Sequence, residues 1–232
     1  MTIKRASSAF KYFSSIVLIG VCIAWRAAAA ANPNFWPMPV GTVWEYYDAK
    51  GRVVRISSIE KVSRTIQTEN GNRIAPVYIL ITDIDGEKVK EEHFAVSDGR
   101  IYKTYTMQLL EGYVTRYIPP AMVIFDGCEV GDSWSYSGIA EVSRRGKSEI
   151  TRYGLVLTSK VVAGGARVLN GEERTSLTIV SDMTYLNEEG EPMLEGKITT
   201  QFVTEVGPWR IVQEPQLPSI NLVLQTFSFP EK

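Results

Sequence analysis

The 232-residue sequence is poor in the residues that most often carry chemistry, with one histidine and two cysteines. A single histidine excludes multi-histidine metal sites and the H-E-x-x-H helix of zinc proteases. The sequence also lacks a G-x-S-x-G elbow, a P-loop, a G-x-G-x-x-G fingerprint and a C-x-x-C pair. These absences predict a protein that is not an enzyme and holds neither a cofactor nor a metal ion. Glycoside hydrolysis stays open, because it needs only two carboxylates about 5 to 10 Å apart, a distance that sequence spacing does not report.

The few reactive side chains that remain fit structural roles. His93 is out of phase with the apolar Phe94 and Val96, which places it toward the wet face of a strand and predicts a solvated ring. Cys128 lies in the segment 126–129, where two carboxylates raise a thiol pKa, so we expect an inert, buried thiol. The sequence therefore predicts no catalytic, metal-binding or cofactor-binding residue, and it leaves any ligand-binding residue open.

Long apolar runs are scarce. The most prominent one, residues 16–25, is shorter than the roughly 20 residues that cross a bilayer as a helix. Basic residues precede it and the small residues 27–31 follow it, which is the layout of a secretory signal peptide. We predict a signal peptide over residues 1–31, cleavage near Ala31, no permanent membrane span in the mature chain, and a periplasmic or secreted protein. Val21 before Cys22 argues against a lipoprotein signal, which needs a small residue there.

Positive charge is also scarce in the mature chain. The whole sequence has 25 basic and 26 acidic residues, and the predicted signal contains four of the basic ones (Lys4, Arg5, Lys11 and Arg26), which leaves 21 against 26 and a net charge of −5. A nucleic-acid partner is therefore not expected. The acidic groups at 87–92 and 188–191 fit solvated turns, and the second lacks the spacing of an EF-hand loop. With Cys128 alone, the mature chain forms no internal disulfide.

The pattern that is present is that of strands and tight turns. Apolar side chains alternate with polar ones along residues 153–157, 177–185 and 197–206, and the continuous apolar run 77–81 predicts a strand covered on both faces. Gly-containing turn pairs separate the runs, among them Asn70-Gly71, Asp85-Gly86 and Asn170-Gly171. Helical periodicity is absent outside the signal, and the one plausible short helix lies near residues 106–110. The sequence predicts an all-β fold.

A heptad that occurs twice predicts an internal duplication. Residues 40–46 and 130–136 both read V-G-x-x-W-x-Y, and later turn landmarks recur in the same order at offsets that grow from 90 to 108. We predict a first β-repeat over residues 32–125 and a second over residues 126–232, forming one continuous domain. The Trp and Tyr of each heptad are two apart, so they share a face and are expected to pack the core.

The two repeats can be joined in two ways. The connecting residues 123–129 are apolar with one glycine, whereas an interdomain linker would be polar, and Pro119-Pro120 predicts a break just before them. We therefore favour an antiparallel meander that runs on into one curved sheet or half-open barrel. The alternative is a two-sheet sandwich.

Three phrases resemble those of a loosely defined family of bacterial exported proteins, mostly described as uncharacterised or TapB-like. They are residues 35–46 (FWPMPVGTVWEY), 98–102 (DGRIY) and 205–212 (EVGPWRIV). The sequence departs from the family at Pro208-Trp209-Arg210, where a small apolar residue and a lysine are usual. The resemblance implies an envelope or secreted all-β module, similar to the open barrels of lipoprotein carriers, and it transfers no catalytic residue.

Two functions fit these observations. The first is a non-catalytic binding or carrier module for an apolar or lipid-like small molecule, which predicts a cavity lined by apolar and aromatic side chains. The second is a structural or assembly partner of an envelope protein, which predicts a filled core with an unprotected strand edge or exposed aromatic side chains.

Overall fold

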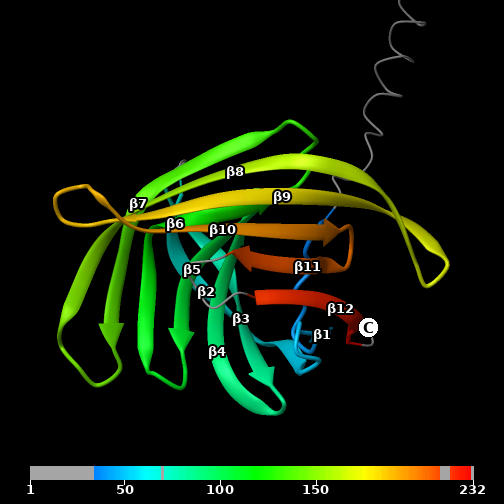
Figure 1. The fold of residues 1–232 in the computed structure, drawn as a ribbon, viewed down its shortest axis with the longest axis horizontal. Coiled ribbons are helices and arrows are strands. Elements are labelled where there is room, and N and C mark those ends of the chain that lie inside the picture. The colour runs from blue at the N-terminus through cyan, green and yellow to red at the C-terminus, as the bar shows by residue number, and fades with distance from the viewer. Residues whose placement is uncertain (1–33, 69–70, 215–219, 231–232) are drawn as a thin grey trace, which may run out of the picture. The chain divides into compact units, whose positions relative to one another are not determined.

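Twelve antiparallel strands make up most of the part of the chain that the computed structural model describes, residues 34–68, 71–214 and 220–230 (Figure 1). The strands are β1 (Val43–Tyr47), β2 (Val53–Thr68), β3 (Gly71–Ile84), β4 (Glu87–Ser97), β5 (Arg100–Gln108), β6 (Tyr113–Phe125), β7 (Ser133–Arg144), β8 (Ile150–Leu169), β9 (Glu172–Leu186), β10 (Pro192–Val203), β11 (Gly207–Glu214) and β12 (Ile220–Ser228). The predicted signal peptide and its cleavage site lie outside the described residues.

The strands form a closed barrel. Each strand pairs with the next one along the chain, and β1 also pairs with β12, which closes the sheet. The all-β antiparallel meander is confirmed, but the predicted half-open sheet and the alternative sandwich are wrong. Alternation shows which residues form strands, whereas closure depends on the first and last strands meeting, and no local pattern encodes that contact.

Cross-strand register identifies the inner face, because directly paired residues point to the same side of a sheet. Trp44 pairs with Ile56, Ile56 with Thr82 and Thr82 with Lys90, which continues the inner face from β1 to β4. The segment before β1 fills the interior next to this row. Trp36 lies 4.7 Å from the ring of Phe94, measured between ring centroids. The main apolar core is therefore inside the barrel, around this segment.

The twin heptads adopt the same local structure. Gly41 and Gly131 have φ angles of 94° and 101°, which an L side chain rarely adopts. The Trp and Tyr side chains that follow donate hydrogen bonds to backbone carbonyls in both copies: Trp44 to Val206 O, Tyr46 to Pro208 O, Trp134 to Met122 O and Tyr136 to Pro119 O. The heptads lead into β1 and β7, six strands apart. The repeat boundaries drawn from the sequence stay a prediction.

Two hairpins are longer than the strands beside them. β1 pairs with β2 only as far as Ser57, and β4 pairs with β3 only from Val77 on, so the far part of the β2–β3 hairpin has no lateral partner strand. The β8–β9 hairpin likewise extends beyond Lys160, the last partner of β7 (Figure 1). The β2–β3 extension folds back on the barrel, because Ile66 of β2 packs with Ala95 of β4 and Tyr102 of β5 on the outer face.

Two further predictions about local structure are wrong. The segment near residues 106–110 belongs to the end of β5 and a turn, because Thr106 pairs across the sheet with Glu92 and with Thr115. Pro119-Pro120 does not end a strand, since β6 runs through both residues, although its ladder with β5 is interrupted there. Among the residues that the structure describes, no helix is long and apolar enough to span a membrane.

Candidate functional site

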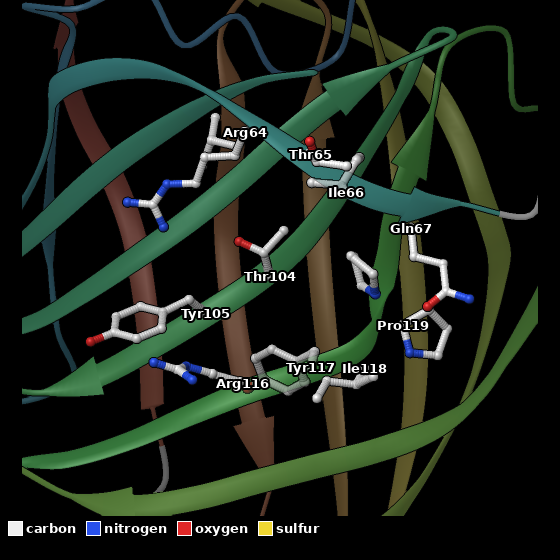
Figure 2. Close-up of a pocket in the computed structure, with 12 residues that line it drawn as sticks. Arg64, Thr65, Ile66, Gln67, Thr104, Tyr105, Arg116, Tyr117, Ile118 and Pro119 are labelled. Carbon is white, nitrogen blue, oxygen red and sulfur yellow. The ribbon is translucent and has the colours of Figure 1, made fainter. Parts of the chain in front are cut away.

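A pocket of about 300 Å³ lies between the extension of β2 and the outer face of β5 and β6. Figure 2 shows β2, which carries Arg64 to Gln67, crossing in front of the strands that carry Tyr105 and Arg116. The lining residues are Arg64, Thr65, Ile66, Gln67, Val77, Thr104, Tyr105, Arg116, Tyr117, Ile118, Pro119 and Pro120. The pocket exists because the buried Ile66 side chain holds β2 over the wall of the barrel.

The floor of the pocket is an interruption in the sheet. Tyr105 pairs with Arg116 and Lys103 pairs with Ala121, so residues 117–120 of β6 stand opposite the single residue Thr104 of β5. Pro119 and Pro120 have no N–H group to donate to a ladder. The extra residues therefore bulge from the wall and supply the apolar end of the pocket.

His93 is buried beside the polar end of the pocket, contrary to the prediction of a solvated ring. It does lie on the outer face, but the β2–β3 hairpin covers it, and its exposed fraction is 4%. Its ring stacks on Tyr105 with centroids 4.4 Å apart. Alternation placed the ring on the correct face, whereas its burial depends on a hairpin folding back from elsewhere in the chain.

A short chain of polar contacts connects Glu91, His93 and Arg64. His93 Nε2 lies 2.7 Å from Glu91 Oε1, and Arg64 Nη1 lies 3.4 Å from His93 Nδ1. Burial lowers the pKa of His93, although the Glu91 carboxylate opposes this. This geometry fits a neutral ring that donates to Glu91 and accepts from Arg64. His93 thus helps to position the Arg64 guanidinium at the mouth of the pocket.

A separate polar cluster, formed by Glu92 with Lys90 and Lys103, lies inside the barrel. Lys103 Nζ lies 2.5 Å from Glu92 Oε1, and Lys90 Nζ lies 2.9 Å from Glu92 Oε2. Burial raises the pKa of the Glu92 carboxyl, but the two ammonium groups outweigh it and hold that pKa at about 2. The prediction of solvated turn charges at 87–92 is therefore wrong for Glu91 and Glu92, which are partners of His93 and of the two lysines.

Tyr117 connects the outer pocket with this interior cluster. It lines the pocket, and its ring centroid lies 5.7 Å from Lys103 Nζ. Tyr117 also makes a side-chain hydrogen bond with Tyr185 of β9, and burial raises the pKa of the Tyr185 hydroxyl to about 12. Tyr117 therefore links the outer pocket to the Lys103–Glu92 pair inside the barrel.

The inner face of β8 to β12 is apolar but incompletely buried. Leu157 pairs with Met183, and Ile198 lies on the same face because it pairs with Ser181, which pairs with Ser159 of β8. Ile211 of β11 pairs with Thr200 of β10, and Ile220 of β12 pairs with Gln213 of β11. Both isoleucines therefore lie on the same inner face. All five apolar side chains are half-buried, so solvent reaches the interior on this side. We call Leu157, Met183, Ile198, Ile211 and Ile220 the inner apolar wall.

Cys128 is buried, as the sequence predicted. Burial raises the pKa of its thiol to about 11, with the Asp132 and Asp126 carboxylates acting in the same direction. A thiol with this pKa is almost entirely protonated at neutral pH and is a poor nucleophile. Within the described ranges, no three or more His, Cys, Asp or Glu side chains are grouped to hold a metal ion.

Sequence reasoning did not single out Arg64, Arg116, Tyr105 or Lys103. Arg64 and Arg116 are 52 positions apart and come together only because the β2–β3 hairpin folds back. A signal was available for Lys103, since it stands between the apolar Ile101 and Tyr105 at the same alternation phase. Such a lysine indicates either an outward face or a buried partner, and the sequence does not distinguish between them.

No protein-family model and no curated protein sequence matches this chain. Among solved structures, a Bacteroides fragilis protein assigned as exported, with a YmcC-like fold, is similar over 85% of this chain and 100% of its own, at 12% identity and a TM-score of 0.51. A Parabacteroides distasonis protein assigned as a lipoprotein covers the same shares at 14% identity and a TM-score of 0.48, which adds nothing to the argument. The first likeness shows a shared fold, and neither points to TapB-like proteins in particular.

Proposed function

We propose that this protein is an exported, non-catalytic binding or carrier module whose barrel interior takes an apolar or lipid-like small molecule. The half-buried inner apolar wall is the observation that carries the proposal, because its side chains face the barrel interior, border the core clusters and still leave apolar surface open to solvent. The neighbouring fold is that of a protein assigned as exported, which supports export of this chain. The TapB-like resemblance belongs to the same proposal and rests on strand and turn phrases.

An uncharged fluorescent probe tests the carrier function. We expect N-phenyl-1-naphthylamine to bind the folded protein with a rise in fluorescence, and Ile198→Trp to reduce that binding by filling the wall. Val162→Trp is the matched control, since Val162 is exposed on the β8–β9 extension. Thermal unfolding of each variant shows that its fold is intact. The proposal fails if the probe does not bind, and also if native mass spectrometry of protein from its own host shows a bare monomer.

A second function, assembly with an envelope protein, is favoured by the β8–β9 extension. The closed barrel has no edge strand, but β8 beyond Val161 has no partner strand among the described residues along the side away from β9. Val168 on this extension is 66% exposed. A partner strand could add to such an edge.

The edge hypothesis is tested by replacing Ala166 with proline. Thr175, which pairs with Ala166, directs its carbonyl away from β8, so the N–H of Ala166 points to the unpaired edge, and the change removes that donor. A protein that co-purifies with the wild type and is lost from Ala166→Pro supports assembly through β8. A co-purifying small molecule that both proteins retain supports the carrier function and removes the need for the edge.

A further inference from the structure

The outer pocket has two guanidinium groups at one end without a carboxylate partner among the described residues. Arg64 and Arg116 both line the pocket and form none of the ion pairs seen for Arg52, Arg55, Arg152 and Arg174. Figure 2 shows both guanidinium groups on the same side of the pocket, near the Tyr105 ring. In a mature chain with a predicted net charge of −5, two unpaired arginines at one pocket make a local site of positive charge.

Three carboxylates lie near this end of the pocket, and none of them forms an ion pair with Arg64 or Arg116. Glu91 is hydrogen-bonded to His93, Glu60 acts on His93, and Glu141, which stands opposite Arg116 in the sheet, pairs with Arg152. Arg145 acts on Tyr105 together with Arg116 and Arg64, which adds positive charge to the same end. Arg64 makes a single contact with His93 through Nη1, so its remaining N–H groups are available to a ligand.

The opposite end of the pocket is apolar. Ile66, Val77, Ile118, Pro119 and Pro120 line it. Figure 2 places Ile118 and Pro119 on the side away from the guanidinium groups. A pocket of about 300 Å³ is at the small end of the range for ligand sites, which favours a compact molecule. The pocket thus combines a short apolar surface with a cationic end.

We propose that this pocket is a second binding site, which takes a short-chain organic acid. Arg64 and Arg116 hold the acid group, and the chain packs on Ile66, Ile118 and Pro119. A planar fork of N–H donors matches the two oxygens of a carboxylate or the oxygens of a phosphate monoester. The site goes beyond the proposed carrier function, because it lies on the outer face and not on the inner apolar wall.

Isothermal titration with octanoate tests the site, with octanol as the uncharged analogue. We expect wild type to bind octanoate and not octanol at the same concentration, and we expect Arg64→Gln and Arg116→Gln each to weaken octanoate binding about tenfold. Arg55→Gln is the matched control, since Arg55 pairs with Glu45 of β1 and neither residue lines the pocket. Arg64→Lys keeps the charge without the fork and should fall between wild type and Arg64→Gln. Octyl phosphate in place of octanoate shows which acid group the fork prefers.

The outcomes separate this site from the carrier function. Octanoate binding that the two glutamine variants leave unchanged overturns the second site, as does equal binding of octanol. Loss of octanoate binding in Lys103→Met, with both arginine variants unaffected, places the acid group in the barrel interior and also overturns it. Binding of N-phenyl-1-naphthylamine is expected to be the same in wild type and both arginine variants, so its absence would count against the carrier function alone.

Discussion

The β2–β3 and β8–β9 hairpins are both longer than the strands on either side of them, but their side chains are buried to different extents. The first folds back on the barrel wall, where Ile66 is only 5% exposed, whereas the second leaves Val162 and Val168 exposed. Their outer parts differ in composition, because β8 has the small residues Ala163-Gly164-Gly165-Ala166.

The difference explains why the outer pocket forms beneath the β2–β3 hairpin. Burial of an isoleucine-sized side chain contributes about 1.5 to 3 kcal/mol, enough to hold a two-stranded ribbon against a wall. The β8–β9 extension is held differently, because Leu169 packs against the main core and Arg167 lies over the Trp209 ring, 4.8 Å from its centroid, while Val162 and Val168 stay exposed. The outer pocket, the burial of His93 and the approach of Arg64 to Arg116 all follow from the folding back of β2–β3.

The largest expected effect is a difference in stability between substitutions in the two heptads. Trp44→Ala should lower the free energy of unfolding by about 3 to 5 kcal/mol, because Trp44 is 1% exposed and packs against Trp36. Trp134→Ala should cost clearly less, since Trp134 is only half-buried. Urea denaturation of both variants measures the difference. Equal losses would show that the two heptads are equivalent in energy as well as in geometry.

The next largest effect is a difference in stability between substitutions in the two long hairpins. Ile66→Ala should cost about 2 to 4 kcal/mol and speed hydrogen exchange in the far part of β2, because it removes the contact with Tyr102 and Ala95. Val168→Ala should change stability by less than about 0.5 kcal/mol. Urea denaturation and amide exchange of both variants check this. A loss for Val168→Ala as large as that for Ile66→Ala would mean that Val168 is also held by packing.

Glycine substitutions are expected to have a moderate effect that depends on the position. Gly207 has a φ of 108°, and a Cβ there would lie 2.7 Å from Trp36 Cδ1, so Gly207→Ala should destabilise the protein by about 1 to 3 kcal/mol. Gly165, on the β8–β9 extension, has open space around the Cβ position. Gly165→Ala should therefore be neutral or slightly stabilising. Thermal unfolding of the two variants tests the contrast, which a loss at Gly165 would contradict.

The smallest effect concerns pH. Because burial lowers the pKa of His93, the unfolded chain binds its proton more readily than the folded one, and stability should fall as the pH drops below the ordinary histidine value of 6.5. Protonated His93 would face Arg64 on β2, with Glu91 and Glu60 opposing that repulsion and Tyr105 stacked on the ring.

A substitution isolates this contribution. His93→Gln, which removes the titrating group, should flatten the slope of stability against pH below 6.5. Urea denaturation of wild type and variant at several pH values between neutral and acidic measures the two slopes. An unchanged slope would show that the titration of His93 is not linked to folding.

Much of the fold could be predicted from local pattern. The inward alternation of Leu155 and Leu157, and of Ile179 and Met183, matches the register of β8 and β9. The buried Trp44 and Tyr46 behave as the heptad predicts. These features depend on the period of two in a strand and on the size of aromatic side chains, and both are written in a few neighbouring residues.

The candidate sites could not be predicted in the same way. Arg64 and Arg116 come from different hairpins, and Glu92 reaches Lys103 only across β4 and β5. Cross-strand distances depend on register and closure, which sequence spacing does not report. The prediction of a solvated His93 failed for this reason, because the covering strand lies almost 30 positions earlier in the chain.

By itself, the sequence determined an all-β antiparallel meander, the positions of its turns, the aromatic anchors of its two heptads and the absence of most catalytic motifs. Each of these depends on the residue types present or on spacing within a few positions. Only the tertiary structure decided that β1 meets β12, that the β2–β3 hairpin covers the outer wall of the barrel, and that a pocket lined by Arg64 and Arg116 forms beneath it. These outcomes depend on contacts between distant segments, where the apolar area buried by Ile66 and Trp36 sets the geometry.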